Sequence, residues 1–215
     1  MYWIRADRPG APRRLTTSEL TQAPGSFSPD GRILAYYQGT GLVGSSDILT
    51  VTISNDGSTL RASDPKPVVE TSADESHPSF SRDGLWMAYA SAGPAGKEVY
   101  VKAWPDDGRS WQVSSGGGSQ PLFSRSRDAL YFLDQDHRVM TVPYRVADRA
   151  FAAGRLRRWS EQPVADLGPQ FWSYDVLPNQ DAVVALTVPE GSQHRGRLVV
   201  LLNAFEYLRH LAPVR

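Results

Sequence analysis

Two aspartate–glycine pairs stand in near-identical surroundings and are the first candidates for chemistry. They lie in Phe27-Ser28-Pro29-Asp30-Gly31 and in Phe80-Ser81-Arg82-Asp83-Gly84. A repeated carboxylate raises the idea of a calcium or ligand site, but calcium loops need several carboxylates that converge on one ion. Aspartate also hydrogen-bonds its own backbone, and glycine takes a positive φ without steric cost. Because each turn offers a single aspartate, we interpret four residues as structural turn residues: Asp30, Gly31, Asp83 and Gly84.

The other candidates for catalysis or metal binding are scattered. The acidic stretches Asp106-Asp107-Gly108 and Asp134-Gln135-Asp136-His137 are typical of solvated turns. The four histidines lack the spacing of metal ligands, and the sequence has no Gly-x-Ser-x-Gly nucleophile elbow. Cysteine is absent, which excludes thiolate catalysis and cysteine-bound zinc. The residues therefore predict no catalytic, cofactor-binding or metal site and no enzyme activity in this chain.

Charge and hydropathy narrow the classes of partner. Lysine plus arginine and aspartate plus glutamate are both 23, so the formal net charge is zero. Non-specific nucleic-acid binding needs an excess of positive charge. No apolar run approaches the roughly 18 residues that span a bilayer, and the first residues lack the layout of a signal peptide. We expect no nucleic-acid partner and no membrane segment in this chain.

Aromatic residues and one histidine mark a candidate binding face. Most tryptophans are expected where sheets pack face to face, but tryptophan is also enriched in binding hot spots. His77 precedes Pro78 at the start of a strand, so we expect it in a loop near the mouth of the fold. The tentative binding face consists of the strand-joining turns near His77, Trp104 and Trp172.

The elements that must position these residues form a repeat. The phenylalanine-containing hairpin returns, in weaker form, so that Phe27, Phe80, Phe123 and Val176 fall in register at intervals of 53, 43 and 53 residues. Asp-Gly between two apolar segments is a strong hairpin signal. A period near ~40–50 residues with several strands per unit is the signature of propeller blades. The sequence predicts an all-β fold, a β-propeller of about four four-stranded blades.

The repeat divides the chain without breaking it into separate domains. We expect a single domain over 1–215, with a half blade at 1–23, an insertion at 147–154, a flexible glycine link at 116–118, and a short C-terminal helix at 204–211. The start inside a half blade predicts that Met1 is an internal or truncated start of a larger propeller, whose cut edge strand invites pairing. The predicted full blades are 24–70, 77–114, 120–161 and 171–202.

Two families share these motifs. The hairpin followed by Ile33-Leu34-Ala35-Tyr36, with a strand such as Glu98-Val99-Tyr100-Val101, resembles the TolB-type, WD-like β-propeller repeats of bacteria. The order of motifs from Glu98 through Trp111-Gln112-Val113-Ser114 to Arg138-Val139-Met140-Thr141 resembles the C-terminal propeller region of bacterial eukaryotic-like serine/threonine protein kinases. That resemblance implies a sensor or interaction domain and favours a periplasmic or extracytoplasmic location. The kinase motifs themselves are absent, so phosphoryl transfer is not implied.

Together these patterns favour a non-catalytic propeller that binds or senses a protein, peptide or other ligand. Two alternatives remain open at this point. One is the accessory or sensor domain of a serine/threonine protein kinase or peptidase whose catalytic domain lies upstream. The other is a TolB-like periplasmic scaffold. The expected partner is a protein or peptide, with edge-strand pairing or self-association as a further expectation.

Overall fold

The computed structural model describes residues 1–7, 9–40, 45–94, 96–147, 150–168, 171–177 and 182–187. Every regular secondary-structure element assigned within these ranges is a β-strand. Accordingly, no helix in the described ranges is long and apolar enough to cross a membrane. The predicted helix at 204–211 and the end of the last predicted blade lie outside the described residues.

Three antiparallel sheets share one plan, in which strands that follow one another in sequence lie side by side. The first contains β3 (Thr21–Phe27), β4 (Ile33–Gly39), β5 (Ser46–Asn55), β6 (Leu60–Ala62) and β7 (Lys66–Val69). The second contains β8 (Glu75–Phe80), β9 (Trp86–Gly93), β10 (Gly96–Ala103) and β11 (Ser110–Gln112). The third contains β12 (Ser119–Phe123), β13 (Ala129–Leu133), β14 (Val139–Ala147), β15 (Ala150–Ala153) and β16 (Arg157–Arg158).

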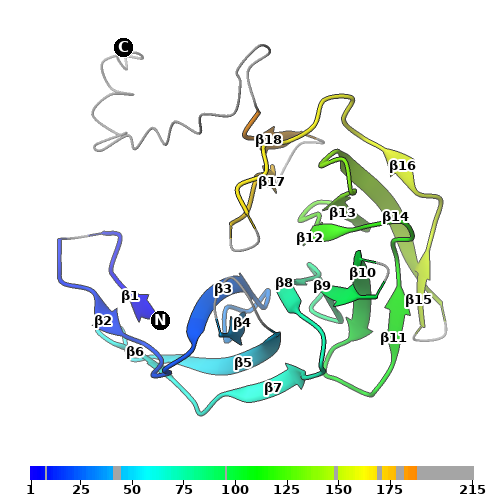
Figure 1. Ribbon diagram of the computed structural model, residues 1–215. Helices are drawn as coiled ribbons and strands as arrows, with labels where there is room; N and C mark the ends of the chain where they lie inside the picture. The colour runs from blue at the N-terminus through cyan, green and yellow to red at the C-terminus, as the bar shows by residue number, and fades with distance from the viewer. Residues whose placement is uncertain are drawn as a thin grey trace, which may run out of the picture.

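Two smaller sheets lie at the two ends of this series. One pairs β1 (Tyr2–Trp3) with β2 (Arg13–Arg14), and the other pairs β17 (Tyr174–Val176) with β18 (Val183–Ala185). Figure 1 shows the sheets following one another around an arc, with β3, β8, β12 and β17 at its centre and β7, β11 and β15 on its outer side. Radially arranged antiparallel sheets of this kind form a β-propeller. The fold is therefore all-β and a partial propeller.

The hydrophobic core lies between consecutive sheets. Side chains alternate along a strand, so each sheet has two faces that pack against its neighbours. Between the first and second sheets, Tyr37 and Ile48 pack against Phe80 and Tyr89. Separate clusters join the second sheet to the third and the third sheet to β17 and β18. This layering explains why apolar residues recur on both faces of the central strands.

The predicted insertion at 147–154 contributes to this core. It supplies β15, which pairs with β14, and the side chain of Phe151 is only 4% exposed. The Phe151 ring lies 5.5 Å from the ring of Trp86 and 4.9 Å from that of Tyr144, measured between centroids. The insertion therefore closes the outer end of the interface between the second and third sheets.

The glycine run at 116–118 links β11 to β12. The N–H groups of Gly116 and Gly117 donate hydrogen bonds to one carboxylate oxygen of Glu98, at 2.9 and 3.0 Å. Gly117 has a φ of +107°, and a Cβ atom there would lie 2.9 Å from the Cβ of Gln135. In contrast to the flexible link expected from composition, the run is held against the second and third sheets, and glycine is required for this close approach.

Candidate functional site

The two Asp-Gly turns close their hairpins through the same hydrogen bonds. The Ser28 hydroxyl donates to Asp30 at 2.6 Å, and the Ser81 hydroxyl donates to Asp83 at 2.5 Å. Each carboxylate also accepts a backbone N–H two residues later, at 3.0 Å. The glycines that follow have φ values of 70° and 71°. The bond from Ser28 is the largest cause that lowers the pKa of Asp30. Both carboxylates are thus engaged within their own turns.

The third turn departs from this pattern. It has no Asp-Gly pair, and the Ser124 hydroxyl instead accepts the N–H of Ser126 at 3.3 Å. Asp128, near the end of this turn, forms an ion pair with Arg82 of the second turn at 3.0 Å. Both side chains are about half exposed, so the pair contributes little to stability. The carboxylate of Asp128, which belongs to the third sheet, therefore balances the positive charge of Arg82.

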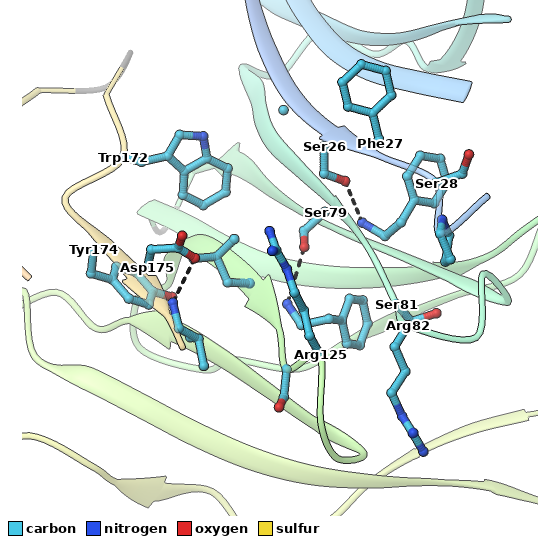
Figure 2. Close-up of a pocket in the computed structure, with 17 residues that line it drawn as sticks. Ser26, Phe27, Ser28, Ser79, Ser81, Arg82, Arg125, Trp172, Tyr174 and Asp175 are labelled. Carbon is cyan, nitrogen blue, oxygen red and sulfur yellow. Dashed lines mark hydrogen bonds between the residues drawn. The ribbon is translucent and has the colours of Figure 1, made fainter. Parts of the chain in front are cut away.

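The central ends of four sheets enclose a pocket of about 640 Å³. It is lined by 25–29, 79–82 and 122–125, together with Trp172 and 174–176 (Figure 2). Each of the four sheets contributes the end of its innermost strand, so the repeat itself builds the pocket. Five serines belong to the lining, Ser26, Ser28, Ser79, Ser81 and Ser124, and all of them except Ser26 are at most 7% exposed.

Two of these serines join one sheet to the next. The N–H of Phe80 donates to the hydroxyl oxygen of Ser26 at 2.8 Å, and the N–H of Phe123 donates to that of Ser79 at 3.2 Å. In each case the serine stands directly before the repeated phenylalanine of its own sheet. We call this position, one residue before the repeated apolar residue, the relay position.

The relay changes in the third and fourth sheets. Leu122 occupies the relay position of the third sheet, and its side chain cannot accept a hydrogen bond. By the pattern of the first two pairs of sheets, the N–H of Val176 would donate to the side chain at position 122. It donates instead to the carboxylate of Asp175, at 2.8 Å. Asp175 is itself the relay residue of the fourth sheet, so the fourth relay position is occupied by a carboxylate.

Arg125 brings a positive charge to the pocket. Figure 2 shows its side chain directed toward Ser79 and Trp172. The residue is exposed. No hydrogen bond or ion pair of its guanidinium is found with the described part of the chain. In contrast, Arg82 is paired with Asp128, and Asp175 accepts a backbone N–H. Arg125 is therefore the cation of this pocket that is available to a ligand.

The structure brings two of the three tentative binding-face residues together. The rings of His77 and Trp172 are in edge-to-face contact with centroids 4.7 Å apart. Trp172 lines the central pocket. Trp104 lies elsewhere, where its ring contacts that of Phe80 at 5.2 Å in the core between the first and second sheets.

The expectation that His77 is a loop residue near the mouth is wrong. His77 lies within β8, and its side chain is 2% exposed. Its φ is 55°, and neither ring nitrogen makes a hydrogen bond in the described structure, although the backbone of Phe171 lies near enough to favour the charged form. Burial, the largest cause, lowers the pKa of His77 to about 4. The His77-Pro78 pair suggested a strand start because proline is common there. In the structure, this pair lies inside β8, where the pairing register with β9 shifts between Ser76 and Ser79.

The acidic turns are internally paired. Asp107 bonds to Arg109 at 2.5 Å, Asp106 to Lys102 at 2.7 Å, and Asp136 to Arg138 at 2.8 Å. In the ranges that the structure describes, no three histidine, aspartate or glutamate side chains come close enough to hold a metal ion. These carboxylates therefore act within their own turns.

Comparisons with known proteins identify the fold. No protein-family model matches the chain, and no curated protein matches its sequence. Among solved structures, TolB from Acinetobacter baumannii matches with a TM-score of 0.52 and 14% identity, over 85% of this chain and 41% of that one. A protein assigned as TolB from Agrobacterium tumefaciens matches with a TM-score of 0.50 and 18% identity, over 69% of this chain and 54% of that one. The fold is that of a TolB-like β-propeller.

A third solved structure shares this propeller fold. It is assigned as a 6-phosphogluconolactonase from Bacteroides uniformis and matches with a TM-score of 0.54 and 15% identity, over 86% of this chain and 56% of that one. The chain thus spans about half the length of the solved structures that it matches. Likeness at this level of identity shows the fold alone. None of the three structures supports the resemblance to the kinase C-terminal region.

Sequence reasoning missed most of the pocket. The relay serines Ser26 and Ser79 and the cation Arg125 were read only as parts of the repeat. One signal for the serines was present, because both stand at the same place before the repeated phenylalanine. No such signal singles out Arg125. Its position matters because the third turn lacks the Asp-Gly pair and directs the side chain toward the centre.

Proposed function

We propose that this chain is a non-catalytic binding module whose central pocket takes a peptide segment that carries an acidic group. The observation that carries the proposal is the guanidinium of Arg125, which lines the pocket and makes no hydrogen bond or ion pair with the described residues. A guanidinium binds a carboxylate with two parallel hydrogen bonds. Ser26 is the partly exposed serine of the lining, and its hydroxyl, which accepts the N–H of Phe80, can still donate to a peptide carbonyl.

The shape of the pocket supports the same class of ligand. Its volume of about 640 Å³ falls in the range of small-molecule and peptide sites, roughly 300–1,000 Å³. Trp172, which is half-buried, and Phe27, which is 52% exposed, supply apolar contact area in this pocket. Tryptophan and arginine are the residues that most often dominate binding energy.

Binding is favoured over catalysis by the chemistry of the lining. The lactonase assignment of one structural neighbour raises hydrolysis as an alternative for this fold. Hydrolysis by a serine needs an adjacent base, and the lining of this pocket includes no histidine, lysine or glutamate. Its one aspartate, Asp175, already accepts the N–H of Val176 at 2.8 Å. The two relay serines are also engaged, because each accepts a backbone N–H.

The wider context of the module is part of this proposal. A TolB-like scaffold and the accessory or sensor domain of a kinase or peptidase both present a propeller to a peptide or protein partner. The TolB-like context is supported by the two TolB matches, whereas the kinase context is supported by sequence resemblance alone. In either context, we propose blades near the bounds predicted from the repeat, 24–70, 77–114, 120–161 and 171–202, with the first three beginning slightly earlier because β3, β8 and β12 start at Thr21, Glu75 and Ser119.

Peptide selection tests the proposal. A phage-displayed library of random heptapeptides is selected on the immobilised chain, and the enriched peptides are synthesised with a fluorescent label for anisotropy titration. We expect enrichment of peptides with aspartate, glutamate or a free C-terminal carboxylate. Because Arg125→Ala removes a charge-assisted pair, it should weaken their binding by roughly tenfold or more.

The matched control is Arg109→Ala. Arg109 is an exposed arginine between β10 and β11 that already pairs with Asp107 and does not line the pocket. We expect this variant to bind the selected peptides as the wild-type chain does. A library that yields no enriched peptide, or peptides that bind Arg125→Ala with unchanged affinity, would contradict the proposal.

A further inference from the structure

The central pocket contains a carboxylate as well as a guanidinium. Asp175 lines the pocket and is exposed, and one oxygen of its side chain accepts the N–H of Val176 at 2.8 Å. A carboxylate has two oxygens with about four sites for hydrogen bonds. Within the described ranges, no arginine, lysine or histidine side chain forms an ion pair with Asp175. Its negative charge is therefore not balanced by the described sheets that build the pocket.

Asp175 and Arg125 are brought to the pocket by two neighbouring inner strands. Arg125 follows β12, and Asp175 lies on β17. The Tyr174 hydroxyl donates to the backbone carbonyl of Gln120 at 2.8 Å, and the Gln120 side chain accepts the N–H of Ser173 at 2.8 Å. The three residues that form these bonds are buried. Buried hydrogen bonds thus hold together the two strands that carry the charges.

The two charged side chains do not neutralise each other by direct contact. No hydrogen bond or ion pair joins Arg125 to Asp175 in the part of the chain that the structure describes, although both line the same pocket as Trp172 (Figure 2). Among the lining residues, the one other charged side chain is Arg82, which pairs with Asp128. The pocket therefore presents one cation and one anion to a ligand.

These two charges discriminate between two kinds of acidic ligand. A ligand that is only negative is attracted by Arg125 and repelled by Asp175, because both charges act within the same pocket. A ligand that also carries a positive group is attracted by both side chains. Trp172 is half-buried and adds a further attraction, because cations bind the face of a tryptophan ring. Complementary charges of this kind determine specificity more than affinity.

We propose that Asp175 selects ligands in which an ammonium or guanidinium group accompanies the acidic group. The ligand is then a peptide segment with both charges. Its carboxylate pairs with Arg125, and its cation pairs with the carboxylate oxygen of Asp175 that does not accept the N–H of Val176. The cation is a lysine or arginine side chain or a free N-terminus, which share this chemistry. This inference rests on the proposed function, because it assigns a second specificity to the same pocket.

Parallel selections test the proposal. The random heptapeptide library is selected on the wild-type chain and on Asp175→Asn, and the enriched peptides are compared. Asparagine keeps the size of the side chain and an oxygen that accepts the N–H of Val176, but it carries no charge. We expect the acidic peptides from the wild-type chain to be enriched in lysine or arginine, or to require a free N-terminus, and those from Asp175→Asn to lack this bias.

Anisotropy titration of synthetic peptides measures the contribution of each charge. Replacing lysine by norleucine, replacing arginine by citrulline and acetylating the N-terminus each remove one cation and show which one contacts Asp175. Loss of that cation should weaken binding to the wild-type chain by roughly three- to fivefold, as for an exposed ion pair. The same loss should leave binding to Asp175→Asn unchanged, whereas loss of the acidic group should weaken binding to both chains.

The matched control is Asp107→Asn. Asp107 already pairs with Arg109 and does not line the pocket, so this variant should bind every peptide as the wild-type chain does. Three results would overturn the role of Asp175 and leave the proposed function intact: acidic peptides that need no cation, a cation that contributes equally to binding of wild-type and Asp175→Asn, or tighter binding of the selected peptides by Asp175→Asn. Selections that enrich no peptide, or unchanged binding by Arg125→Ala, would instead contradict the proposed function and this inference with it.

Discussion

At the scale of single residues, equivalent positions of the repeat carry side chains with different hydrogen-bonding groups. Gln120 of the third sheet corresponds to His77 of the second, and both have positive φ values, 51° and 55°. The Gln120 side chain exchanges hydrogen bonds with Ser173, at 2.8 Å to its backbone N–H and 3.3 Å to its hydroxyl. The ring nitrogens of His77 make no such bonds in the described structure. A buried base without a partner resists protonation.

This difference predicts a pH dependence of stability. The pKa of His77 falls from its ordinary value of 6.5 to about 4 because of burial. Between these values the unfolded chain binds a proton that the folded chain does not. Stability that is fully present above pH ~6.5 is therefore lost as pH falls toward the folded pKa. Relative to His77→Gln, the wild type should lose roughly 2–3 kcal/mol between pH 7 and pH 4.5.

Urea denaturation of both proteins at several pH values checks this expectation. Glu75 lies two residues away, and burial is the largest cause that raises its pKa. Its contribution has the opposite sign, because stability is lost as pH rises through the raised pKa. Since both proteins keep Glu75, the difference between them isolates His77. Parallel pH profiles would show that His77 is not the group that resists protonation.

At the scale of elements, neighbouring sheets are joined by packing and by the relay. Ser79 illustrates the polar part, because its hydroxyl oxygen accepts the N–H of Phe123 from the next sheet at 3.2 Å. Ser79 is 3% exposed and Phe123 is 6% exposed. A buried N–H that loses its acceptor incurs the full cost of desolvation.

Ser79→Ala should therefore lower the free energy of unfolding by roughly 1–3 kcal/mol. Chemical denaturation measures the change. Ser72→Ala serves as the control, because Ser72 is exposed and precedes β8, and it should alter stability by less than about 0.5 kcal/mol. Equal effects of the two substitutions would indicate that the relay contributes nothing beyond the packing between the sheets.

At the scale of the whole molecule, the curvature of the arc creates two distinct surfaces. The pocket gathers the inner ends of four sheets around Arg125, whereas the two end faces expose Phe27 and Val184. The pocket is proposed to act mainly through charge. Peptide binding should therefore respond to ionic strength, because salt screens exposed charges.

Raising the NaCl concentration from about 0.05 M to about 0.5 M shortens the Debye length from roughly 14 Å to roughly 4 Å. Binding of selected acidic peptides should weaken severalfold over this range. Anisotropy titration at the two salt concentrations measures the change. An affinity that stays the same at high salt would indicate that the charge of Arg125 does not drive peptide binding.

The local structure of this protein is encoded in short stretches of its sequence. Hairpin turns are encoded within a few residues, so Asp30 and Gly31 predict their turn without knowledge of any other sheet. Strand alternation is likewise local, and its recurrence near Phe27, Phe80 and Phe123 was enough to predict an all-β propeller. These features follow from backbone sterics and from the period of side chains along a strand.

Which residues of different sheets come into contact depends on the packing of the sheets. His77 is buried because Tyr37 and Trp172, from other sheets, pack against its ring. Arg125 lines a pocket because four sheets direct their inner ends to one place. The exposure of Phe27 likewise depends on what lies against its sheet, and its own sequence context is nearly that of Phe80. Burial and partnership are properties of contacts between sheets far apart in the chain, and a local pattern carries no record of them.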